Sequence, residues 1–552
     1  MAVMNTELFD VSGLSGLPGL PDESALQELA NQFFAAPPVP QGAAAGIPSS
    51  VAGSGISPSA HHQGNSVDLK DPQTSLPDPH FAGKGLVPSS VAGSGRSPST
   101  EQPTRKLQGS LSSFTTDPGF YFIEEKSAFV RSQPALPAHG ALPSAPFDVN
   151  QVRKDFPILR QYVNGRPLVW LDNAATTQKP QPVIDRISHF YENDNSNIHR
   201  AAHELAARST DAYEGARDKV RQFLNASSSN EIVFVRGATE AINLVAKSWG
   251  AQFLQPGDEI IVSHLEHHAN IVPWQQLSAA KGLKLKVIPV DDDGQVLLEE
   301  YARLLSSKTK LVSFTQVSNA LGTITPAQKI VEMAHAAGAK ALVDGAQAVS
   351  HMPVDVRALD ADWYVFSGHK VFGPTGIGVL YGKEELLNET APWQGGGNMI
   401  KDVTFEHTTY QQAPGRFEAG TGNIADAVGL GAAIDYVSAI GMGLIGQYEH
   451  YLLQYATRLL KEVPGLRLIG TAPDKAGVLS FIMDGYRTED IGAALNQSGI
   501  AVRSGHHCAQ PILRRFGVES SVRPSLALYN TCSDIDALIA VLHRLRTARP
   551  GI

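Results

Sequence analysis

The sequence contains little cysteine, and this scarcity restricts both its class and its surroundings. Only Cys508 and Cys532 occur among 552 residues. Two cysteines cannot build the disulfide framework of a small secreted domain, and both can persist as free thiols in a reducing compartment. We therefore expect a cytoplasmic protein. The net charge of −9 at pH 7 indicates no nucleic-acid partner.

Early basic residues and long apolar runs are also missing. The first lysine or arginine is Lys70, so we expect neither a secretory signal nor a transit peptide. No apolar run approaches the roughly 20 residues that span a bilayer. The sequence therefore predicts no membrane partner.

Aromatic residues are nearly absent from one long stretch, because Phe81 is the only one in residues 37–113. Chains this poor in apolar surface do not offset the entropy of folding. The motif PSSVAGSGISPS at 48–59 returns as PSSVAGSGRSPS at 88–99, without helical or strand periodicity. We predict that residues 1–147 form a largely disordered, low-complexity extension.

Two short segments of this extension are different. Residues 20–37 have a helical apolar stripe, and residues 117–130 contain four aromatics. We predict that both segments are short docking motifs. They either fold back onto the chain's own globular part or dock onto another protein.

From residue 148 onward the sequence predicts an α/β fold. Six apolar, β-rich runs alternate with helix-length segments, which is typical of a mainly parallel sheet with helices on both faces. The runs are EIVFVRG (231–237), DEIIVS (258–263), KLKVIPV (284–290), TKLVSFT (309–315), KALVDGA (340–346) and WYVFSG (363–368). Ligands of such sheets bind beyond the carboxyl ends of the strands.

Polar residues follow several of these ends. Gly237 and Thr239 begin a predicted helix, which can offer backbone N–H groups to a phosphate, although this signal alone is weak. Asp344 ends another run, with Gln347 three residues later. A carboxylate there more often caps the next helix, but it can also hold a cationic ring nitrogen.

Two further strand ends complete the set. Ser367, His369 and Lys370 precede a glycine-rich stretch, and a lysine at that edge can form a Schiff base. His267 and His268 follow another run, but the HExxH spacing is absent and the cysteines are far apart, so we expect no metal site. Phosphate site, ring-nitrogen carboxylate, lysine and stacking imidazole together predict pyridoxal 5'-phosphate.

The motifs EHHANIVPW, VSNALGTITP, VDGAQAV, FSGHKVFGPTGIG, RFEAGTGN and RSGHHCAQP resemble the group II, SUF-type cysteine desulfurases. These are fold type I aminotransferase-like α/β enzymes. The resemblance covers residues 148–552 and implies a homodimer. It also implies a large cofactor domain over 148–438, with 148–170 packing against a smaller C-terminal α+β domain over 439–552.

The resemblance implies a role for each site residue. Cys508 is the nucleophile that receives sulfur from L-cysteine as a persulfide, and Lys370 binds the cofactor and moves the substrate's α-proton. Asn319 and Arg523 bind the substrate carboxylate. The remaining residues hold the cofactor: Asp344, Gln347, His267, Thr239, Ser367, His369 and, from the neighbouring subunit, Thr421. Cys532 has no implied role.

The chain departs from the family pattern in three places. The segment that usually reads RAS reads RPS here, so Pro524 replaces the alanine that follows the arginine. Gly415 stands where related enzymes often have an aromatic residue. The extension is the third departure. It is similar to the tails of cargo enzymes in family 2 encapsulin shells, which implies a shell partner and a nanocompartment location.

Three alternatives remain open. The first is a selenocysteine lyase or cysteine sulfinate desulfinase with the same cofactor. The second is an iron–sulfur assembly enzyme whose tail recruits a sulfur-acceptor protein. The third is a binding protein with a retired active site, against which intact Lys370, Asp344 and Cys508 argue.

Overall fold

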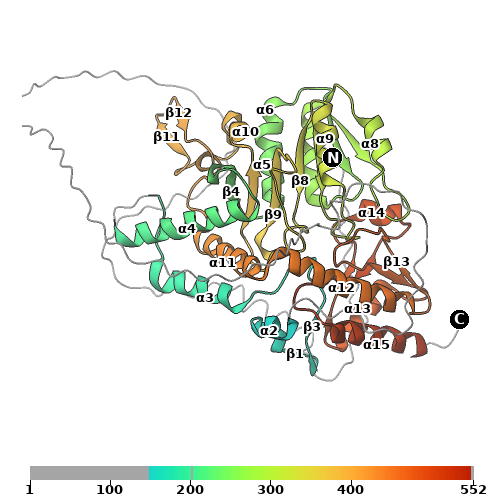
Figure 1. Cartoon of the computed structure of the whole chain (residues 1–552). Helices are drawn as coiled ribbons and strands as arrows, with labels where there is room; N and C mark the ends of the chain where they lie inside the picture. Colours follow the sequence, from blue (N-terminus) through green and yellow to red (C-terminus); the bar gives the residue numbers. More distant parts are fainter. Residues whose placement is uncertain (1–147, 200–202, 549–552) are drawn as a thin grey trace, which may run out of the picture. The chain divides into compact units, whose positions relative to one another are not determined.

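The computed structural model describes residues 148–199 and 203–548. The extension 1–147, with the predicted docking motifs at 20–37 and 117–130, lies outside the described residues. The predictions for that extension therefore stay predictions. The described part contains the α/β architecture that the sequence predicts (Figure 1).

The central element is a seven-stranded sheet with the order β4-β10-β9-β8-β7-β5-β6. All six predicted runs are strands of this sheet, and the neighbours β9-β8-β7-β5-β6 pair in parallel. The six strands are β4 (Ile232–Val235), β5 (Glu259–Ser263), β6 (Lys284–Ile288), β7 (Thr309–Thr315), β8 (Lys340–Asp344) and β9 (Trp363–Ser367).

The seventh strand, β10 (Gly378–Gly382), is missing from the sequence prediction. It lies between β4 and β9 and runs antiparallel to both. Its sequence, GVLYG, is apolar and entirely buried. The strand follows the glycine-rich stretch, so its start lies at the edge where β4 and β9 end.

Each face of the sheet has its own apolar core, because successive strand residues point to opposite sides. Ile232 and Phe234 of β4 belong to one core, while Val233 and Val235 belong to the other. The first core includes residues of α4 (Glu204–Phe223), α8 (Leu298–Leu304), α9 (Ala327–Ala336) and α11 (Ile424–Ile440), and α3 (Gln181–His189) packs against α11. The second core includes residues of α5 (Ala238–Val245), α7 (Val272–Lys281) and α10 (Glu384–Glu389).

The C-terminal part contains a second, four-stranded sheet of order β13-β14-β17-β16. Three helices pack against it in a third core: α12 (Met442–Lys461), α13 (Thr488–Gln497) and α15 (Cys532–Ala548). The strands are β13 (Leu466–Leu468), β14 (Phe481–Met483), β16 (Arg503–Gly505) and β17 (Ser521–Arg523). The predicted domain boundary at 438/439 stays a prediction.

The first described segment meets this C-terminal part directly. Strand β3 (Val169–Trp170) pairs in parallel with β15 (Ile500–Ala501). Helix α2 (Val149–Lys154) precedes it, and Arg153 forms an ion pair of 2.9 Å with Asp534. These contacts bring the chain beside the end of the central sheet, where residues 172–179 meet the site described below.

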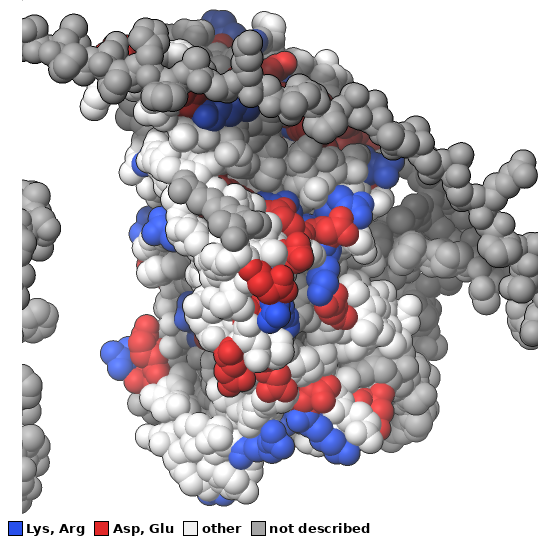
Figure 2. Space-filling model, turned by 90° about the vertical axis from the view of Figure 1, so that its left-hand side faces the viewer, with Lys and Arg blue, Asp and Glu red and all other residues white. Residues whose placement is uncertain are grey.

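The surface carries mixed charge. Figure 2 shows a band of interleaved acidic and basic side chains flanked by uncharged surface, and the described residues form no continuous basic patch on this face. No single described helix is long and apolar enough to cross a bilayer. Together α11 and α12 reach that length and composition, but they are bent by 75° at their junction.

Candidate active site

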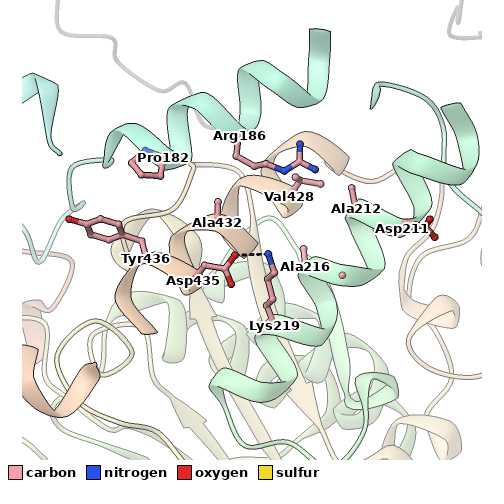
Figure 3. A pocket seen from close by; sticks show the side chains of 11 residues that line it. Pro182, Arg186, Asp211, Ala212, Ala216, Lys219, Val428, Ala432, Asp435 and Tyr436 are labelled. Carbon is pink, nitrogen blue, oxygen red and sulfur yellow. Dashed lines mark hydrogen bonds and ion pairs between the residues drawn. The ribbon is translucent and has the colours of Figure 1, made fainter. Parts of the chain in front are cut away.

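Two hollows are prominent in the described part of the chain. The larger, of about 480 Å³, lies between α3, α4 and α11, and an ion pair of 2.5 Å joins Lys219 to Asp435 in its wall (Figure 3). Its lining includes no cysteine, serine or histidine that could act as a nucleophile or base. Size therefore does not identify the reactive site.

The smaller hollow, of about 190 Å³, lies at the carboxyl ends of the parallel strands. It is lined by ten of the eleven predicted site residues: Thr239, His267, Asn319, Asp344, Gln347, Ser367, His369, Lys370, Cys508 and Arg523. Thr421 does not line it and is exposed in the loop before α11. The prediction that Thr421 serves a neighbouring subunit stays a prediction.

Asp344 and Gln347 form the floor of this cavity. Asp344 ends β8 and is 4% exposed, and its Oδ1 accepts a hydrogen bond of 2.9 Å from the Ala346 N–H. Burial raises the pKa of Asp344, while that backbone bond and the charge of Lys370 lower it. The Gln347 Nε2 donates to the Ala174 carbonyl at 2.7 Å. Asp344 is therefore placed by the end of β8, and Gln347 by its bond to the segment that precedes α3.

The turn from β4 to α5 approaches the neighbouring strand closely. A Cβ atom at Gly378 would lie 2.4 Å from the Gly237 Cα, so only glycine fits there. Ser367 accepts a bond of 2.9 Å at Oγ from the Ala238 N–H, and Thr239 follows in the first turn of α5. Hydroxyl groups and the N–H groups of a helix start are a suitable site for a phosphate.

Lys370 lies in the turn that follows β9. Burial lowers the pKa of Lys370 to about 8, and the positive charge of Arg523 acts in the same direction. The carbonyl of the preceding His369 accepts four hydrogen bonds: from the Thr177 N–H at 3.0 Å, the Thr176 Oγ1 at 3.0 Å, the Thr177 Oγ1 at 3.2 Å and the Lys179 Nζ at 3.3 Å. This dense bonding fixes the backbone that carries Lys370.

His267 follows β5 and lines the same cavity. Its Nδ1 accepts a hydrogen bond of 3.0 Å from the Ala269 N–H. Burial, together with the charge of Lys370, lowers the pKa of His267 to about 3. The ring is therefore neutral at physiological pH, which suits stacking on an aromatic cofactor.

Arg523 and Asn319 are both buried, and a hydrogen bond joins them. The Arg523 Nη1 donates to the Asn319 carbonyl at 2.8 Å, and its Nη2 lies 3.3 Å from Asp172. The Asn319 Nδ2 donates to the His507 carbonyl at 2.7 Å. The Asn319 amide has two N–H groups, so the second can still donate to a carboxylate. Its substrate role stays a prediction.

Cys508 lies in a loop between β16 and α14 (Gln510–Arg515). His507 and Cys508 have φ values of 53° and 54°, a left-handed conformation that is uncommon outside glycine. Such residues cost about 1–3 kcal/mol each and persist only where the surrounding structure fixes them. Cys508 is half-buried and lines the cavity that Lys370 also lines.

Sequence reasoning missed several residues of the site. Arg503 and His507 line the cavity, and Asp172 forms ion pairs with Arg503 at 3.5 Å and with Arg523 at 3.3 Å. The segment LDNAATTQK at 171–179 supplies Asp172 and the donors to the His369 carbonyl. A polar run directly after the apolar VWL was the available signal.

The cavity suits an organic anion with a cationic ring. Among the described residues, no group of three or more histidine, cysteine, aspartate or glutamate side chains could hold a metal ion. Three buried polar atoms of cavity residues have no hydrogen-bond partner: Asn319 Oδ1, His507 Nδ1 and Arg523 Nε. Such atoms are costly unless a ligand pairs with them. Together with Asp344, Lys370 and the turn from β4 to α5, they fit pyridoxal 5'-phosphate and an amino-acid substrate.

Known proteins share this architecture. The aminotransferase class-V family model matches residues 169–538. A cysteine desulfurase from Synechococcus elongatus is 65% identical over 462 residues, covering 81% of this chain and 74% of the relative. A cysteine desulfurase from Dickeya dadantii is 54% identical over 400 residues, covering 72% of this chain and 97% of the relative.

A solved structure agrees in fold. The crystal structure of the cysteine desulfurase CsdA from Escherichia coli has a TM-score of 0.68 and 41% identity, and covers 73% of this chain and 99% of its own. The predicted fold type I α/β class and the predicted cofactor are thereby confirmed. This chain belongs to the class-V aminotransferase family and, within it, to the pyridoxal-phosphate-dependent cysteine desulfurases.

Proposed function

We propose that this enzyme converts L-cysteine to L-alanine and holds the released sulfur as a persulfide on Cys508. The observation that carries the proposal is that Cys508 and Lys370 line one cavity with Asp344 and His267. The step balances without an external oxidant. The Cys508 thiolate bonds to the substrate sulfur, the substrate C–S bond breaks, its electron pair stays on Cβ, and Cβ takes a proton.

Lys370 has the properties of a proton carrier in this reaction. Bound pyridoxal phosphate supplies an electron sink for charge that develops at the substrate Cα. A pKa of about 8 lets the Lys370 Nζ accept the Cα proton and release it near neutral pH. Asp344 faces the cofactor's ring nitrogen in this proposal, Gln347 its hydroxyl, and His267 covers the ring.

The phosphate and the substrate carboxylate have separate sites in the proposal. Thr239, Ser367 and His369 hold the phosphate, with Thr421 of the partner subunit, so the enzyme acts as a homodimer. Arg523 and Asn319 receive the carboxylate, for which the guanidinium provides a bidentate fork. Sedimentation of the purified enzyme tests the dimer, and a monomer that retains full activity contradicts it.

The decisive experiment compares two cysteine substitutions. Cys508→Ala removes the sulfur carrier, so alanine production from L-cysteine stops while cofactor absorbance persists. Cys532→Ala is the matched control, because Cys532 starts α15 and does not line the cavity. Unchanged alanine production by Cys508→Ala contradicts the proposed role of the thiol.

The same variant separates the related reactions. Selenium and sulfite are better leaving groups than sulfide, so a selenocysteine lyase or a cysteine sulfinate desulfinase works without the thiol. Turnover of all three substrates by Cys508→Ala measures this difference. Loss confined to L-cysteine favours desulfuration as the thiol-dependent reaction.

We infer that the enzyme is of the group II, SUF type and that the extension 1–147 addresses it as cargo to an encapsulin shell in the cytoplasm. The match to the Synechococcus relative supports a shared extension. It spans 81% of 552 residues, about 447, whereas 148–552 comprises 405, so about 40 matched residues precede residue 148. The Dickeya match spans only 72% of the chain.

Truncation of the extension tests this targeting role. The full-length chain and a chain starting at residue 148 are assayed for alanine and for co-purification with a shell protein. Capture of the full-length form alone, with equal activity of both, supports the cargo role. Capture of a sulfur-acceptor or iron–sulfur scaffold protein instead favours the recruiting role of the tail.

A further inference from the structure

The Cys508 loop is bonded to His268, a residue that neither the sequence prediction nor the proposed chemistry uses. The His268 N–H donates to the Cys508 carbonyl at 2.8 Å. The His268 Nε2 accepts a hydrogen bond of 3.3 Å from the Gln510 N–H. One residue therefore holds the loop at Cys508 and again two residues later.

A second imidazole completes the arrangement. The Cys508 N–H donates to the His506 Nδ1 at 3.1 Å. The rings of His506 and His268 stack, with centroids 5.8 Å apart and planes 29° apart. The backbone N–H groups of Cys508 and Gln510 thus each donate to an unprotonated imidazole nitrogen.

The loop needs such support because of its backbone. His507 and Cys508 both have positive φ values, and neither is glycine. A residue in this region relaxes to an ordinary conformation unless outside contacts hold it. His268 supplies such contacts from the segment after β5, which is 242 residues before Gln510 in the sequence.

We propose that His268 is a positioning residue for Cys508, holding the thiol loop in its strained form beside the cavity. This inference rests on the proposed role of Cys508. His267 lines the cavity and His268 holds the loop, so one dipeptide links the cofactor face to the nucleophile loop. The main-chain bond survives any substitution at 268, whereas the bond from Gln510 requires an acceptor on the side chain.

Two substitutions isolate that acceptor. His268→Phe keeps a ring that can stack on His506 but removes the acceptor for Gln510. His268→Gln restores an acceptor at the same reach. Both are made in the full-length holoenzyme with Cys532→Ala, so that only Cys508 reacts with iodoacetamide.

The readout is the rate of Cys508 alkylation without substrate, followed by intact mass. We expect His268→Phe to react about fivefold faster, the ratio that corresponds to about 1 kcal/mol for one neutral hydrogen bond. We expect His268→Gln to stay within about twofold of the parent. In the cysteine assay, His268→Phe lowers kcat about fivefold with KM and cofactor absorbance unchanged. His543→Phe, exposed on α15, changes none of these values.

Three results overturn the proposal: a parent-like alkylation rate in His268→Phe, no rescue by His268→Gln, or loss of cofactor in His268→Phe. If His268→Phe does not accumulate as folded protein, His268→Asn replaces it, because its shorter side chain cannot reach Gln510. The alkylation rate does not depend on turnover. Failure of the proposed function, with Cys508→Ala still producing alanine, is therefore distinguishable from failure of this inference.

Discussion

Asp344 and Cys508 face one cavity from two differently built regions. Asp344 ends a buried strand between two parallel neighbours, and its backbone is paired on both sides. Cys508 lies in a left-handed loop, half-buried, with histidine side chains as its backbone partners. The backbone at Asp344 is therefore held by two neighbouring strands, whereas the backbone at Cys508 is held by a few contacts to histidines. The following predictions test this difference between floor and loop.

The largest effect on alanine production is expected for Lys370→Ala. Removing the Nζ removes both the covalent anchor of the cofactor and the proton carrier, so alanine production falls at least about 10³-fold. Absorbance of the purified enzyme and alanine release measure this. Cofactor absorbance equal to that of the wild type contradicts the anchor role.

The next largest effect is expected for Asp344→Asn. The neutral amide cannot stabilise positive charge on a ring nitrogen, so kcat falls about 10²-fold. Because Asn keeps the shape of Asp, the cavity remains. Cofactor affinity is measured by fluorescence titration, and wild-type kcat in this variant excludes the proposed pairing.

Glu266, which lies in the turn after β5 and does not line the cavity, provides a pH test. This carboxyl is completely buried and bonded to the Thr315 N–H at 3.0 Å and to Asn270 at 2.6 Å. Burial raises the pKa of Glu266 to about 8, and the charge of Asp344 adds to the effect. The carboxyl is thus protonated in the folded protein while it ionises near its ordinary value in the unfolded chain. Its stabilisation is complete below that ordinary value and is lost as pH rises through about 8.

Glu266→Gln should flatten this dependence. Between pH 5.5 and 7.5 the wild type loses about 1.4 kcal/mol of unfolding free energy per pH unit from this group, and the variant does not. Denaturant melts at both pH values measure the difference. Equal pH slopes in the two proteins show that Glu266 ionises freely.

The smallest effect is expected in the loop. His506→Phe removes the acceptor for the Cys508 N–H but leaves the floor intact, so kcat falls about fivefold while cofactor affinity is unchanged. Steady-state kinetics and cofactor titration measure both quantities. A loss of cofactor affinity would mean that loop and floor are not separate units.

Much of the floor could be predicted because strand ends are visible in sequence. The runs that end at Asp344 and Ser367 are apolar and β-rich, and parallel strands bring their ends to one edge. Strand β10 was missed because its sequence, GVLYG, has only three apolar residues between two glycines and directly follows a glycine-rich stretch. The bonds from Thr176 and Lys179 to the His369 carbonyl join segments about 190 residues apart in sequence, and no local pattern predicts them.

The loop was predicted as a motif but not as a geometry. RSGHHCAQP marks the cysteine, yet the left-handed backbone of His507 and Cys508 depends on contacts from the distant His268. Orphaned atoms such as Arg523 Nε likewise arise only when β17 is buried against Asp172 and Asn319. These features follow from packing rather than from local preference.

The insertion of β10 between β4 and β9 also affects how the enzyme matures. Ser367 and the Ala238 N–H that it binds are 129 residues apart in sequence. Long-range pairings of this kind form slowly, because distant segments must first meet. During synthesis, the contact between Ser367 and the Ala238 N–H cannot form in the complete sheet until residues 378–382 have been made and lie between β4 and β9. Closure of this edge of the sheet is therefore a late event in synthesis, and the contact between Ser367 and Ala238 marks a chain whose central sheet is complete.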